Sequence, residues 1–575
     1  MEARKPMQVL AAIAATCMAL PAICQGTADP AVSHGRKPDI LLIVLDDVGY
    51  SDLGSYGSEI STPALDQLAA QGLRYTRFET KAMCSPTRAS LLTGRNSHTL
   101  GMADLPAEVP AARNDYPAIR GEMPANAETL AQALHEQGYI SWALGKWHLS
   151  PTYDATAKTS WPLQRAFDHF YGFIKGWTDQ FRPQLVRDNQ PIPPPSSPGY
   201  HLTEDLVDKA IAAFDSTSPA DVTKPLFVYL ALGAAHAPLQ VPASYIERYS
   251  SVYQQGWDAL RAARFARMKR MGIVPRKAEL SPRNRGDKAW ADLSDLEKRV
   301  FSRFMATYAG FLTHADEHIA RLIQHLKDTG RYENTLIIML SDNGAASEGG
   351  PNGGFFTPYS DPTPVAKMDA RLAELGGPTT QPLYQRPWAM LGSTPFRRYK
   401  LWPFEGGTRT PLITAWSGHI ADPGGLRAQL VDVIDIAPTI LEAAGGAFRT
   451  TINGQVQLTV AGRSVLATLR NPHANTRRAQ YFEMRGNRAI IDDKWKAVAM
   501  HPCGADHSAD RWELFRADTD PAETRDLSAA FPGQLLRMQR LWEQEATRYG
   551  AATPGIAPYS PDMCRYTGYA DEVGD

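Results

Sequence analysis

One segment of the chain combines a cysteine, a proline and an arginine at spacings that could do chemistry. Cys84 opens the segment, Pro86 and Arg88 follow two and four positions later, and Gly94 closes it. Proline suits the first turn of a helix and glycine its C-terminal end, which predicts a short helix beginning at Cys84. Backbone N–H groups at a helix N-terminus favour an anion, and Arg88 lies one turn further on. A reactive residue, a thiolate activated by the helix dipole and a small buried core residue are the open interpretations of Cys84.

A second set of residues offers only oxygen atoms. Asp46 and Asp47 stand side by side, and Asp342 and Asn343 stand side by side much later in the chain. Each pair alone is weak evidence, because such sequences often form ordinary turns. Carboxylate and amide oxygens suit Ca²⁺ or Mg²⁺ better than zinc, and three carboxylates in one pocket would repel one another without a cation. Together the pairs predict a site for a divalent cation.

Cationic and ionisable side chains complete the candidate set. Fixed cations stabilise the negative charge that develops when an ester of an anionic group is cleaved. A lone histidine is more often a core residue and a lone lysine a solvated one, so these residues are informative only as a group. The group consists of Arg88, Lys146, His148, His236 and Lys400.

Alternating apolar runs and helical patterns predict the elements that must position these residues. Short apolar runs bounded by Gly, Asp or Pro indicate buried strands of a mainly parallel sheet, and helices between them indicate an α/β sandwich. Candidate residues directly follow four of the runs. Ligands of open α/β sheets bind beyond the carboxyl ends of the strands, so the candidates are expected to converge. Strands are predicted at 40–45, 139–144, 226–232, 336–340 and 412–416, and helices at 64–71, 127–137 and 308–328.

Three further regions have their own patterns. Apolar residues three and four apart in 257–271 predict an amphipathic helix packed on the protein, in preference to a lid or a membrane-surface helix. The Gly- and Pro-rich residues 345–400 predict a long loop over the active face. From about residue 478, a small antiparallel sheet with one helix is expected. Its strands are predicted at 479–484, 488–491, 495–500 and 512–515, and its helix around 535–542.

The N-terminus and the overall composition bear on location. Residues 1–26 begin with basic residues and continue with an apolar stretch, which predicts a secretory signal peptide and export. In an oxidising compartment Cys503 and Cys564 could pair, leaving Cys84 free, although two unpaired thiols are an alternative. With 60 basic and 61 acidic residues, no general attraction to nucleic acid is expected. No later apolar stretch is long enough for stable membrane insertion.

These motifs resemble those of the type I, formylglycine-dependent sulfatases. The resemblance covers roughly residues 37–550, keeps the family's motif order, and varies slightly only at Arg409–Pro411. Residues 256–271 are similar to a segment of bacterial periplasmic arylsulfatases in particular. The matching motifs are Leu45–Gly49, Cys84–Arg95, Gly145–His148, His236–Pro238, Ser341–Gly344, and Lys400 followed by Glu405–Pro411.

The resemblance implies a fold, a metal and a modified residue. The expected fold is an alkaline-phosphatase-like α/β sandwich with a large mixed, mainly parallel sheet over 37–475, and a C-terminal α+β domain with an antiparallel sheet over 476–575. Cys84 is expected to become Cα-formylglycine through a formylglycine-generating or an anaerobic sulfatase-maturating enzyme. One Ca²⁺ per chain is expected, with ligands Asp46, Asp47, residue 84, Asp342 and Asn343.

The resemblance also implies roles in catalysis. One hydroxyl of the hydrated formylglycine attacks sulfur, and His236 or Lys400 protonates the leaving alcohol. His148 then deprotonates the second hydroxyl, so that the aldehyde re-forms and sulfate leaves. The residues expected to hold the diol and sulfate oxygens are Arg88 and Lys146.

The sequence therefore predicts an exported enzyme, periplasmic or secreted, that hydrolyses aryl or simple alkyl sulfate esters. A phosphonate monoester or phosphodiester hydrolase with the same signature is the first alternative. A secreted, catalytically silent binding protein is the second, and it requires Cys84 to stay unmodified. Selectivity for the substrate is expected in the loops at 100–125, 175–200 and 345–400.

Overall fold

The computed structural model describes residues 1–2, 36–106, 117–153, 158–216, 224–355, 363–452, 454–502 and 506–551. Nearly all of the predicted signal peptide lies outside the described residues, as do Cys503 and Cys564. The leader and the disulfide therefore stay predictions. The described residues from Lys37 onward belong to one compact unit. The predicted domain boundary at residue 475 stays a prediction.

A ten-stranded sheet forms the centre of this unit. Its strands are β1 (Asp39–Leu45), β2 (Leu73–Tyr75), β4 (Ile140–Lys146), β5 (His169–Phe173), β6 (Leu185–Arg187), β7 (Gln190–Ile192), β8 (Leu226–Ala231), β9 (Thr335–Ser341), β10 (Leu412–Ala415) and β11 (Leu426–Arg427). They are ordered β11-β2-β10-β9-β1-β8-β4-β5-β6-β7. The central strands β9, β1, β8, β4 and β5 run parallel, whereas β10, β6 and β7 pair antiparallel. The mixed, mainly parallel sheet predicted from the apolar runs is confirmed.

The central strand β1 is apolar along its whole length because both faces of the sheet are covered. Leu41 and Ile43 belong to one buried cluster, and Ile40 and Leu42 to another. Successive side chains of a strand point to opposite faces, so a strand between two helix layers needs apolar residues at every position. This requirement is what made the strand visible in the sequence.

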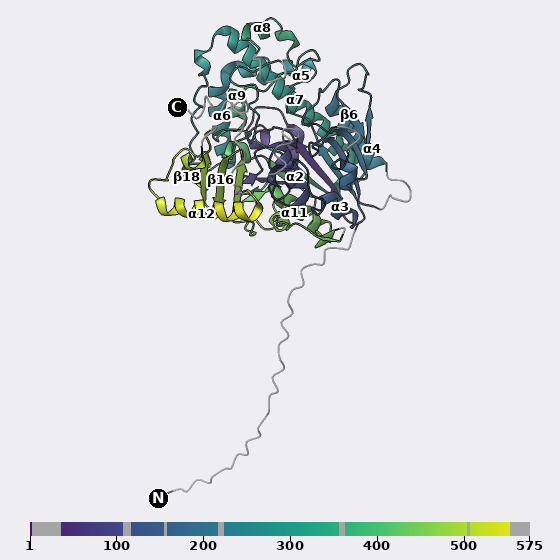
Figure 1. Ribbon diagram of the computed structural model, residues 1–575, viewed down its shortest axis with the longest axis vertical. Coiled ribbons are helices and arrows are strands. Elements are labelled where there is room, and N and C mark those ends of the chain that lie inside the picture. Colours follow the sequence, from purple (N-terminus) through teal and green to yellow (C-terminus); the bar gives the residue numbers. More distant parts are fainter. Residues whose placement is uncertain are drawn as a thin grey trace. The chain divides into compact units, whose positions relative to one another are not determined.

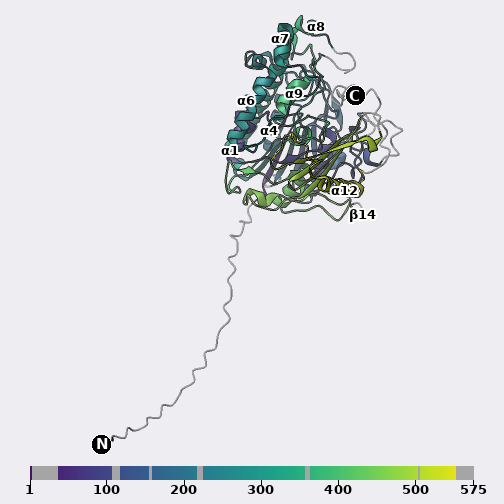
Figure 2. The same cartoon turned by 90° about the vertical axis from the view of Figure 1, so that its left-hand side faces the viewer.

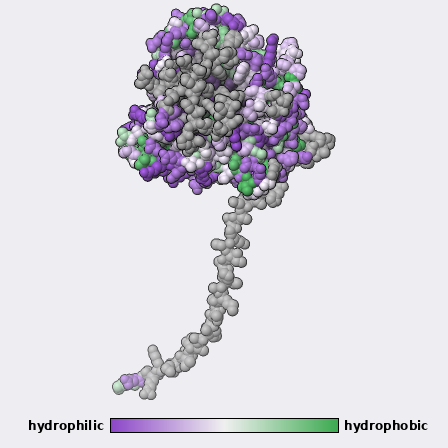
Figure 3. All heavy atoms as spheres, viewed as in Figure 1, coloured by the Kyte–Doolittle hydropathy of each residue, from purple (hydrophilic) through white to green (hydrophobic). Residues whose placement is uncertain are grey.

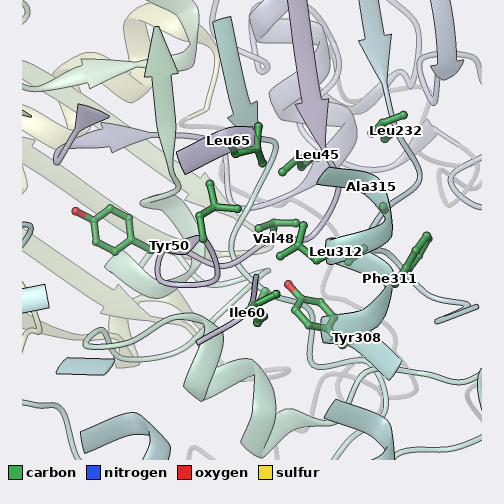
Figure 4. Close-up of a cluster of buried hydrophobic side chains, with 14 of the residues drawn as sticks. Leu45, Val48, Tyr50, Ile60, Leu65, Leu232, Tyr308, Phe311, Leu312 and Ala315 are labelled. Atoms are coloured by element: carbon green, nitrogen blue, oxygen red, sulfur yellow. The ribbon is translucent and has the colours of Figure 1, made fainter. Parts of the chain in front are cut away.

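Two groups of helices cover the two faces. On one face lie α1 (Pro63–Gln71), α4 (Leu202–Asp215), α6 (Gly256–Met271) and α7 (Asp295–Asp328), which Figure 2 shows together. On the other lie α2 (Cys84–Thr93), α3 (Leu130–His135) and α11 (Ile436–Ala443), grouped in Figure 1. In Figure 4, Tyr308, Phe311 and Leu312 of α7 lie close to Leu45 and Val48 at the end of β1. Helix α7 therefore packs against the end of β1 that precedes Asp46 and Asp47.

The helix boundaries follow from capping residues. Helix α2 begins at Cys84 as predicted, and Gly94 ends it with a left-handed φ of 65°, a conformation that glycine adopts without strain. The predicted helix 308–328 is only the later part of α7. That helix starts earlier because Ser294 and Glu297 form a capping box, which satisfies its first free N–H groups. The helix predicted at 127–137 is shorter, Leu130–His135. It starts later than expected because Thr129 is its N-cap.

The prediction of a long loop over 345–400 is wrong in part. The segment contains the short helices α8 (Val365–Asp369) and α9 (Arg386–Gly392), and every residue of α9 is buried. Trp388 of α9 packs against Trp257 of α6, with ring centroids 5.2 Å apart. The segment is thus partly core, and its Gly and Pro residues separate packed pieces. The helix predicted at 257–271 is present as α6, and its Trp257 and Met268 are buried as expected. The expected solvation of its basic residues is wrong in part, because Arg261 and Arg264 are buried as well.

A second, antiparallel sheet follows near the C-terminus, as predicted. It consists of β15 (Ala479–Met484), β16 (Asn487–Asp492), β17 (Trp495–Met500) and β18 (Arg511–Arg516), in that order. Helix α12 (Pro532–Tyr549) packs across it and buries Met538 and Trp542. Figure 1 shows α12 beneath β16 and β18.

The surface carries no marked apolar region on the face seen in Figure 3, where hydrophobic residues stand scattered among hydrophilic ones in the coloured part. Among the described residues, no helix combines the length and apolar character needed to cross a bilayer.

Candidate active site

The carboxyl ends of four neighbouring parallel strands bring the candidate residues together. Strands β9, β1, β8 and β4 are adjacent in the sheet. Each is followed by polar residues at the same edge, as the sequence predicted. They are Asp342 and Asn343 after β9, Asp46 and Asp47 after β1, His236 after β8, and Lys146 and His148 at the end of β4.

Glycines let the segment that holds Lys400 approach the turn after β9 closely enough to bring Lys400 into the site. A β-carbon at Gly344 would lie 1.9 Å from the carbonyl oxygen of Gly406, and one at Gly407 would lie 2.0 Å from that of Trp402. Any larger residue would push these backbones apart. The Lys400 N–H donates to the Ala345 carbonyl at 3.0 Å, which fixes the lysine beside the Asp342–Asn343 turn.

Helix α2 places Cys84 against His148. The Cys84 Sγ lies 3.3 Å from His148 Nδ1, and Ser85 Oγ donates to the His148 carbonyl at 2.7 Å. Gly176 presses on the other side of this ring, where a β-carbon would meet His148 Cε1 at 2.6 Å. The imidazole is therefore held at the N-terminus of α2. This is the position at which the sequence predicts that an anion is favoured.

Asp46 and Asp342 are paired with fixed cations beneath Cys84. Lys146 Nζ donates to both Asp46 oxygens, at 3.0 and 2.7 Å. Arg88 contacts Asp342 Oδ2 through Nε at 2.9 Å and through Nη2 at 2.7 Å, and its Nη2 lies 3.6 Å from Asp46 Oδ1. Arg88 was expected to reach towards residue 84, but its hydrogen bonds to side-chain carboxylates run to Asp342. The mutual repulsion of the aspartates is thus already offset by protein cations.

Asp47 lies at the centre of a second group. It accepts from Lys400 Nζ at 3.0 Å and from Asn343 Nδ2 at 2.6 Å, and its Oδ2 lies 3.5 Å from His236 Nε2. Lys400 also donates to Glu348 Oε1 at 2.6 Å. Asp47 has a left-handed φ of 59°, a conformation that Asp and Asn tolerate better than most residues. This backbone turn directs its carboxylate away from β1 and towards Lys400.

The oxygen donors fit a hard divalent cation. The Asn343 amide donates to the Gly344 carbonyl at 2.9 Å as well as to Asp47, so its orientation is fixed and its Oδ1 is left buried without a hydrogen-bond partner. Ligand atoms of Asp46, Asp47 and His236 lie within 4.8 Å of one another. A buried amide oxygen beside carboxylates is the donor chemistry of Ca²⁺ or Mg²⁺.

The environment sets the charge of each group. Burial raises the pKa of Asp342 to about 6, with Asp46 adding to the rise and Arg88 opposing it. Burial also favours a raised pKa at Asp47, but Lys400 and His236 outweigh it and lower the pKa to about 2. Burial disfavours the charged form of Lys400, yet Asp47 and Glu348 hold its pKa well above the usual value. Asp47 and Lys400 are therefore a stable ion pair.

The thiol and the two histidines are held neutral. Burial raises the pKa of Cys84 to about 11, which favours the neutral thiol over a thiolate activated by the helix dipole. Burial, with Lys146 and Arg88, lowers the pKa of His148 far below its usual value. Burial also lowers the pKa of His236, although Asp47 opposes the shift. Neutral histidines can accept a proton, as the expected role of His148 requires.

A cavity of about 700 Å³ opens above these residues. Cys84, His148, His236 and Lys400 line it, whereas the remaining candidates lie buried below. The loops expected to set selectivity supply its walls. Their contributions are Leu105, Lys175, Gly176, Trp177, Thr178, Asp179, Arg182, Gln184, Ser347, Glu348 and Gln381.

Several residues of the site were missed by sequence reasoning. Glu348 pairs with Lys400, and Tyr229 OH lies 3.4 Å from Arg88 Nη1. Arg485 lines the cavity from the turn between β15 and β16. Tyr229 could have been noticed in the sequence, because its polar hydroxyl group lies within an otherwise apolar predicted strand. Glu348 and Arg485 lie in turns whose sequences resemble any exposed turn.

The comparisons with known proteins agree with this geometry. A family model described as Sulfatase matches residues 38–447. The chain belongs to the sulfatase family. A second model, N-sulphoglucosamine sulphohydrolase, C-terminal, matches residues 398–544 of this sulfatase. The sheet and its two helix layers accordingly form the alkaline-phosphatase-like fold of sulfatases. The protein is a sulfuric ester hydrolase.

Named relatives extend over most of the sulfatase. An uncharacterized sulfatase of Schizosaccharomyces pombe is 31% identical and covers 91% of this chain and 95% of its own. The arylsulfatase of Klebsiella aerogenes is 30% identical, over 71% of this chain and 87% of its own.

Solved structures share the fold at low identity. Ps i-CgsB, crystallised with a neocarrahexaose, has a TM-score of 0.62 at 23% identity and covers 94% of this chain and 98% of its own. The phosphonate monoester hydrolase of Agrobacterium radiobacter has a TM-score of 0.55 at 16% identity, covering 89% and 96%. One fold thus serves proteins with different names, and the substrate must be argued from the site.

Proposed function

We propose that this sulfatase hydrolyses aryl or simple alkyl sulfate esters, using a formylglycine at position 84 and one Ca²⁺. The observation that carries the choice of substrate is the apolar patch around Cys84. Met83 and Met484 are buried beside it, and Leu105 and Leu401 pack against them. Leu105, Met83 and Leu401 also line the cavity. An aromatic ring or alkyl chain attached to the sulfate could bury its surface there.

The metal is proposed to bind Asp46, Asp47, Asp342 and Asn343 together with residue 84. Bound there, Ca²⁺ would supply positive charge to the sulfate oxygens and to the nucleophile. Protein cations already pair with the three aspartates, so a divalent ion would make the site net positive. A positive site suits a substrate that carries a negative charge.

Formylglycine at position 84 would supply, as its hydrate, a nucleophilic oxygen and a second hydroxyl whose deprotonation releases sulfate. His148 is proposed to take that proton, because its Nδ1 lies 3.3 Å from the residue 84 side chain and burial keeps it neutral. Lys400 and His236 face the cavity above Asp47. They are proposed to hold or protonate the leaving oxygen. Arg88 and Lys146 orient Asp342 and Asp46, and so fix the floor of the site.

Location and maturation follow from the same proposal. The basic and apolar pattern of residues 1–26 supports export to the periplasm or the medium. A formylglycine-generating or anaerobic sulfatase-maturating enzyme would have to act on Cys84 before the chain folds, because Cys84 is buried in the native structure.

The experiment compares turnover of 4-nitrophenyl sulfate with that of a phenylphosphonate monoester. The protein is co-expressed with a maturation enzyme, and the mass of the peptide holding residue 84 reports the aldehyde. We expect sulfate preference, with Cys84→Ala lowering turnover by about 10⁴-fold or more at an unchanged melting temperature. Preference for the phosphonate would move the protein to the alternative hydrolase. Wild-type activity in Cys84→Ala would refute the nucleophile.

A further inference from the structure

The cavity wall opposite the apolar patch carries exposed cations beside an exposed tryptophan. Lys175, Trp177 and Arg182 all line the cavity, and Trp177 is 39% exposed. Ligand pockets are commonly lined by aromatic side chains, which contact the apolar part of the ligand. Among the described residues, no carboxylate forms an ion pair with Lys175 or Arg182. Lys175 Nζ lies over the Tyr153 ring, 5.4 Å from its centroid, a contact that leaves the positive charge of Lys175 unneutralised. A ligand anion can therefore pair with either cation.

This wall lies next to the reacting atoms. The His148 N–H donates to the Ile174 carbonyl at 3.0 Å, and Gly176 presses on the His148 ring. His148 in turn contacts Cys84 Sγ. Lys175 and Trp177 flank Gly176 in the chain. Their backbones therefore lie beside His148, the residue that contacts Cys84. The wall thus borders the part of the cavity next to residue 84.

The segment that carries Arg182 is held rigidly. Asp179 Oδ1 accepts from the Arg182 N–H at 2.8 Å, and Asp179 Oδ2 accepts from Gln240 Nε2 at 2.8 Å. The Gln180 N–H donates to Gln240 Oε1 at 2.8 Å, and Gln240 is fully buried. Preorganised groups lose little entropy on binding, so the turn is suited to recognition.

A third cavity cation provides the contrast. Arg485 lines the cavity but donates to Asp104 Oδ1 through Nη2 at 3.0 Å. Its charge is neutralised within the protein, and Lys400 is likewise paired with Asp47 and Glu348. The carboxylate nearest to Arg182 in the chain, Asp179, is occupied by backbone N–H groups and Gln240. The wall therefore carries two cations, Lys175 and Arg182, against one carboxylate, Asp179, whose oxygens are held by neutral N–H donors.

We infer that the preferred substrate carries a second anionic group on the ring that leaves, and that Lys175 and Arg182 bind this group while Trp177 contacts the ring. The inference rests on the proposed sulfatase function and adds a substrate class to it: dianionic sulfate esters. A sulfate ester with a neutral leaving group would fill the apolar patch but leave both cations unpaired.

The test compares 3- and 4-sulfooxybenzoate with their methyl esters, which lack the second charge. The quantity measured is the ratio of kcat/KM for the anionic substrate to that for its ester. Differences in leaving-group basicity affect every variant equally and cancel when ratios are compared. We expect the double variant Lys175→Gln/Arg182→Gln to lower the ratio about tenfold, with the methyl ester unaffected.

A matched control removes two charges elsewhere. Lys277→Gln/Arg270→Gln changes two exposed side chains outside the cavity lining and should leave the ratio unchanged. High salt should lower the wild-type ratio and have little effect on the pocket variant, because exposed charges are screened. Trp177→Ala should lower kcat/KM for both aryl esters by about three- to tenfold without changing their ratio.

The outcomes separate the two claims. An active enzyme whose ratio is the same in wild type and pocket variant would overturn this inference alone, as would an equal fall in the control. Failure of the mature wild type on 4-nitrophenyl sulfate as well would overturn the proposed function, and the inference with it.

Discussion

Two buried groups of charges can be compared in this sulfatase. The catalytic cluster consists of Asp46, Asp47, Asp342, Arg88, Lys146 and Lys400. The joint cluster consists of Glu79, Glu405, Glu523, Arg409 and Lys496. In the joint cluster, Lys496 of β17 pairs with Glu405 at 2.9 Å and with Glu523 at 3.1 Å, and Arg409 pairs with Glu405 and Glu79. It ties the C-terminal sheet to the segment around Glu405 and to Glu79 beside the large sheet.

The two clusters differ in access. His148, His236 and Lys400 connect the catalytic cluster to the cavity, and Asn343 Oδ1 stays unpartnered below it. The joint cluster is closed, with all five side chains nearly inaccessible. Glu405 and Arg409 belong to the same sequence motif as Lys400, yet their contacts are structural. Residue type and motif membership do not distinguish the two clusters, whereas access to the cavity does.

Asp47→Asn should lower activity far more than it lowers stability. Asn tolerates the left-handed backbone, and Lys400 keeps Glu348 as partner, so the fold should persist. Loss of one carboxylate from the proposed metal site should lower kcat/KM by about 10³-fold, in line with the loss of one electrostatic contact at a reacting centre. The measurement is steady-state turnover together with chemical denaturation. An unfolding free energy reduced as strongly as the rate would make Asp47 structural.

Lys496→Met should lower stability and leave activity nearly unchanged, the opposite of Asp47→Asn. It leaves three buried glutamates with Arg409 as the cation remaining in the cluster, and removing one partner from a buried ion pair costs about 3–5 kcal/mol. The denaturation midpoint should fall, while kcat/KM measured well below the transition stays near wild type. A large loss of activity in fully folded protein would contradict the division between the clusters.

Removal of the metal should affect only the catalytic cluster. Chelation should abolish turnover and lower the melting temperature, and added Ca²⁺ should restore both. At 100 times its Kd a bound ion stabilises by about 2.7 kcal/mol. The Ca²⁺-dependent shift should persist in Lys496→Met and vanish in Asp47→Asn. A chelated wild type with full activity would refute the metal site.

The pH dependence of stability should report the joint cluster, with the smallest effect. Burial, helped by Glu405, raises the pKa of Glu79 to about 7, and burial raises that of Glu523 to about 7. A carboxyl with a raised folded pKa contributes stability that is present below about pH 4.5 and is lost as the pH rises through 7. Glu79→Gln cannot ionise, so relative to wild type it should gain about 2–3 kcal/mol between pH 5 and 8.

The control for this titration is Glu442→Gln, which changes an exposed glutamate of α11. Its pH profile gives the baseline for removing one exposed carboxylate. A Glu79→Gln curve parallel to that of the control would show that Glu79 does not titrate in this range.

Patterns confined to one element were predicted correctly. Apolar runs marked β1, β4, β8, β9 and β10 because a strand covered on both faces must be apolar throughout. Pro86 and Gly94 marked the ends of α2 because each suits one end of a helix. Convergence of Asp46, Asp342, His236 and Lys146 followed from one rule about strand ends. The sequence by itself therefore determined the sheet and the edge at which these candidate residues meet.

Contacts between distant segments were decided only by the tertiary structure. Lys400 and Asp47 are 353 positions apart, and no periodicity links them. The pairing of Lys400 with Glu348, the packed helix α9 inside a Gly- and Pro-rich segment, and the free charges of Lys175 and Arg182 were likewise invisible in the sequence. Local propensity acts over a few residues, whereas partners, burial and cavity walls depend on how distant loops meet. The candidate residues could thus be identified from the chain, but the shape and charge of the cavity wall around them required the fold.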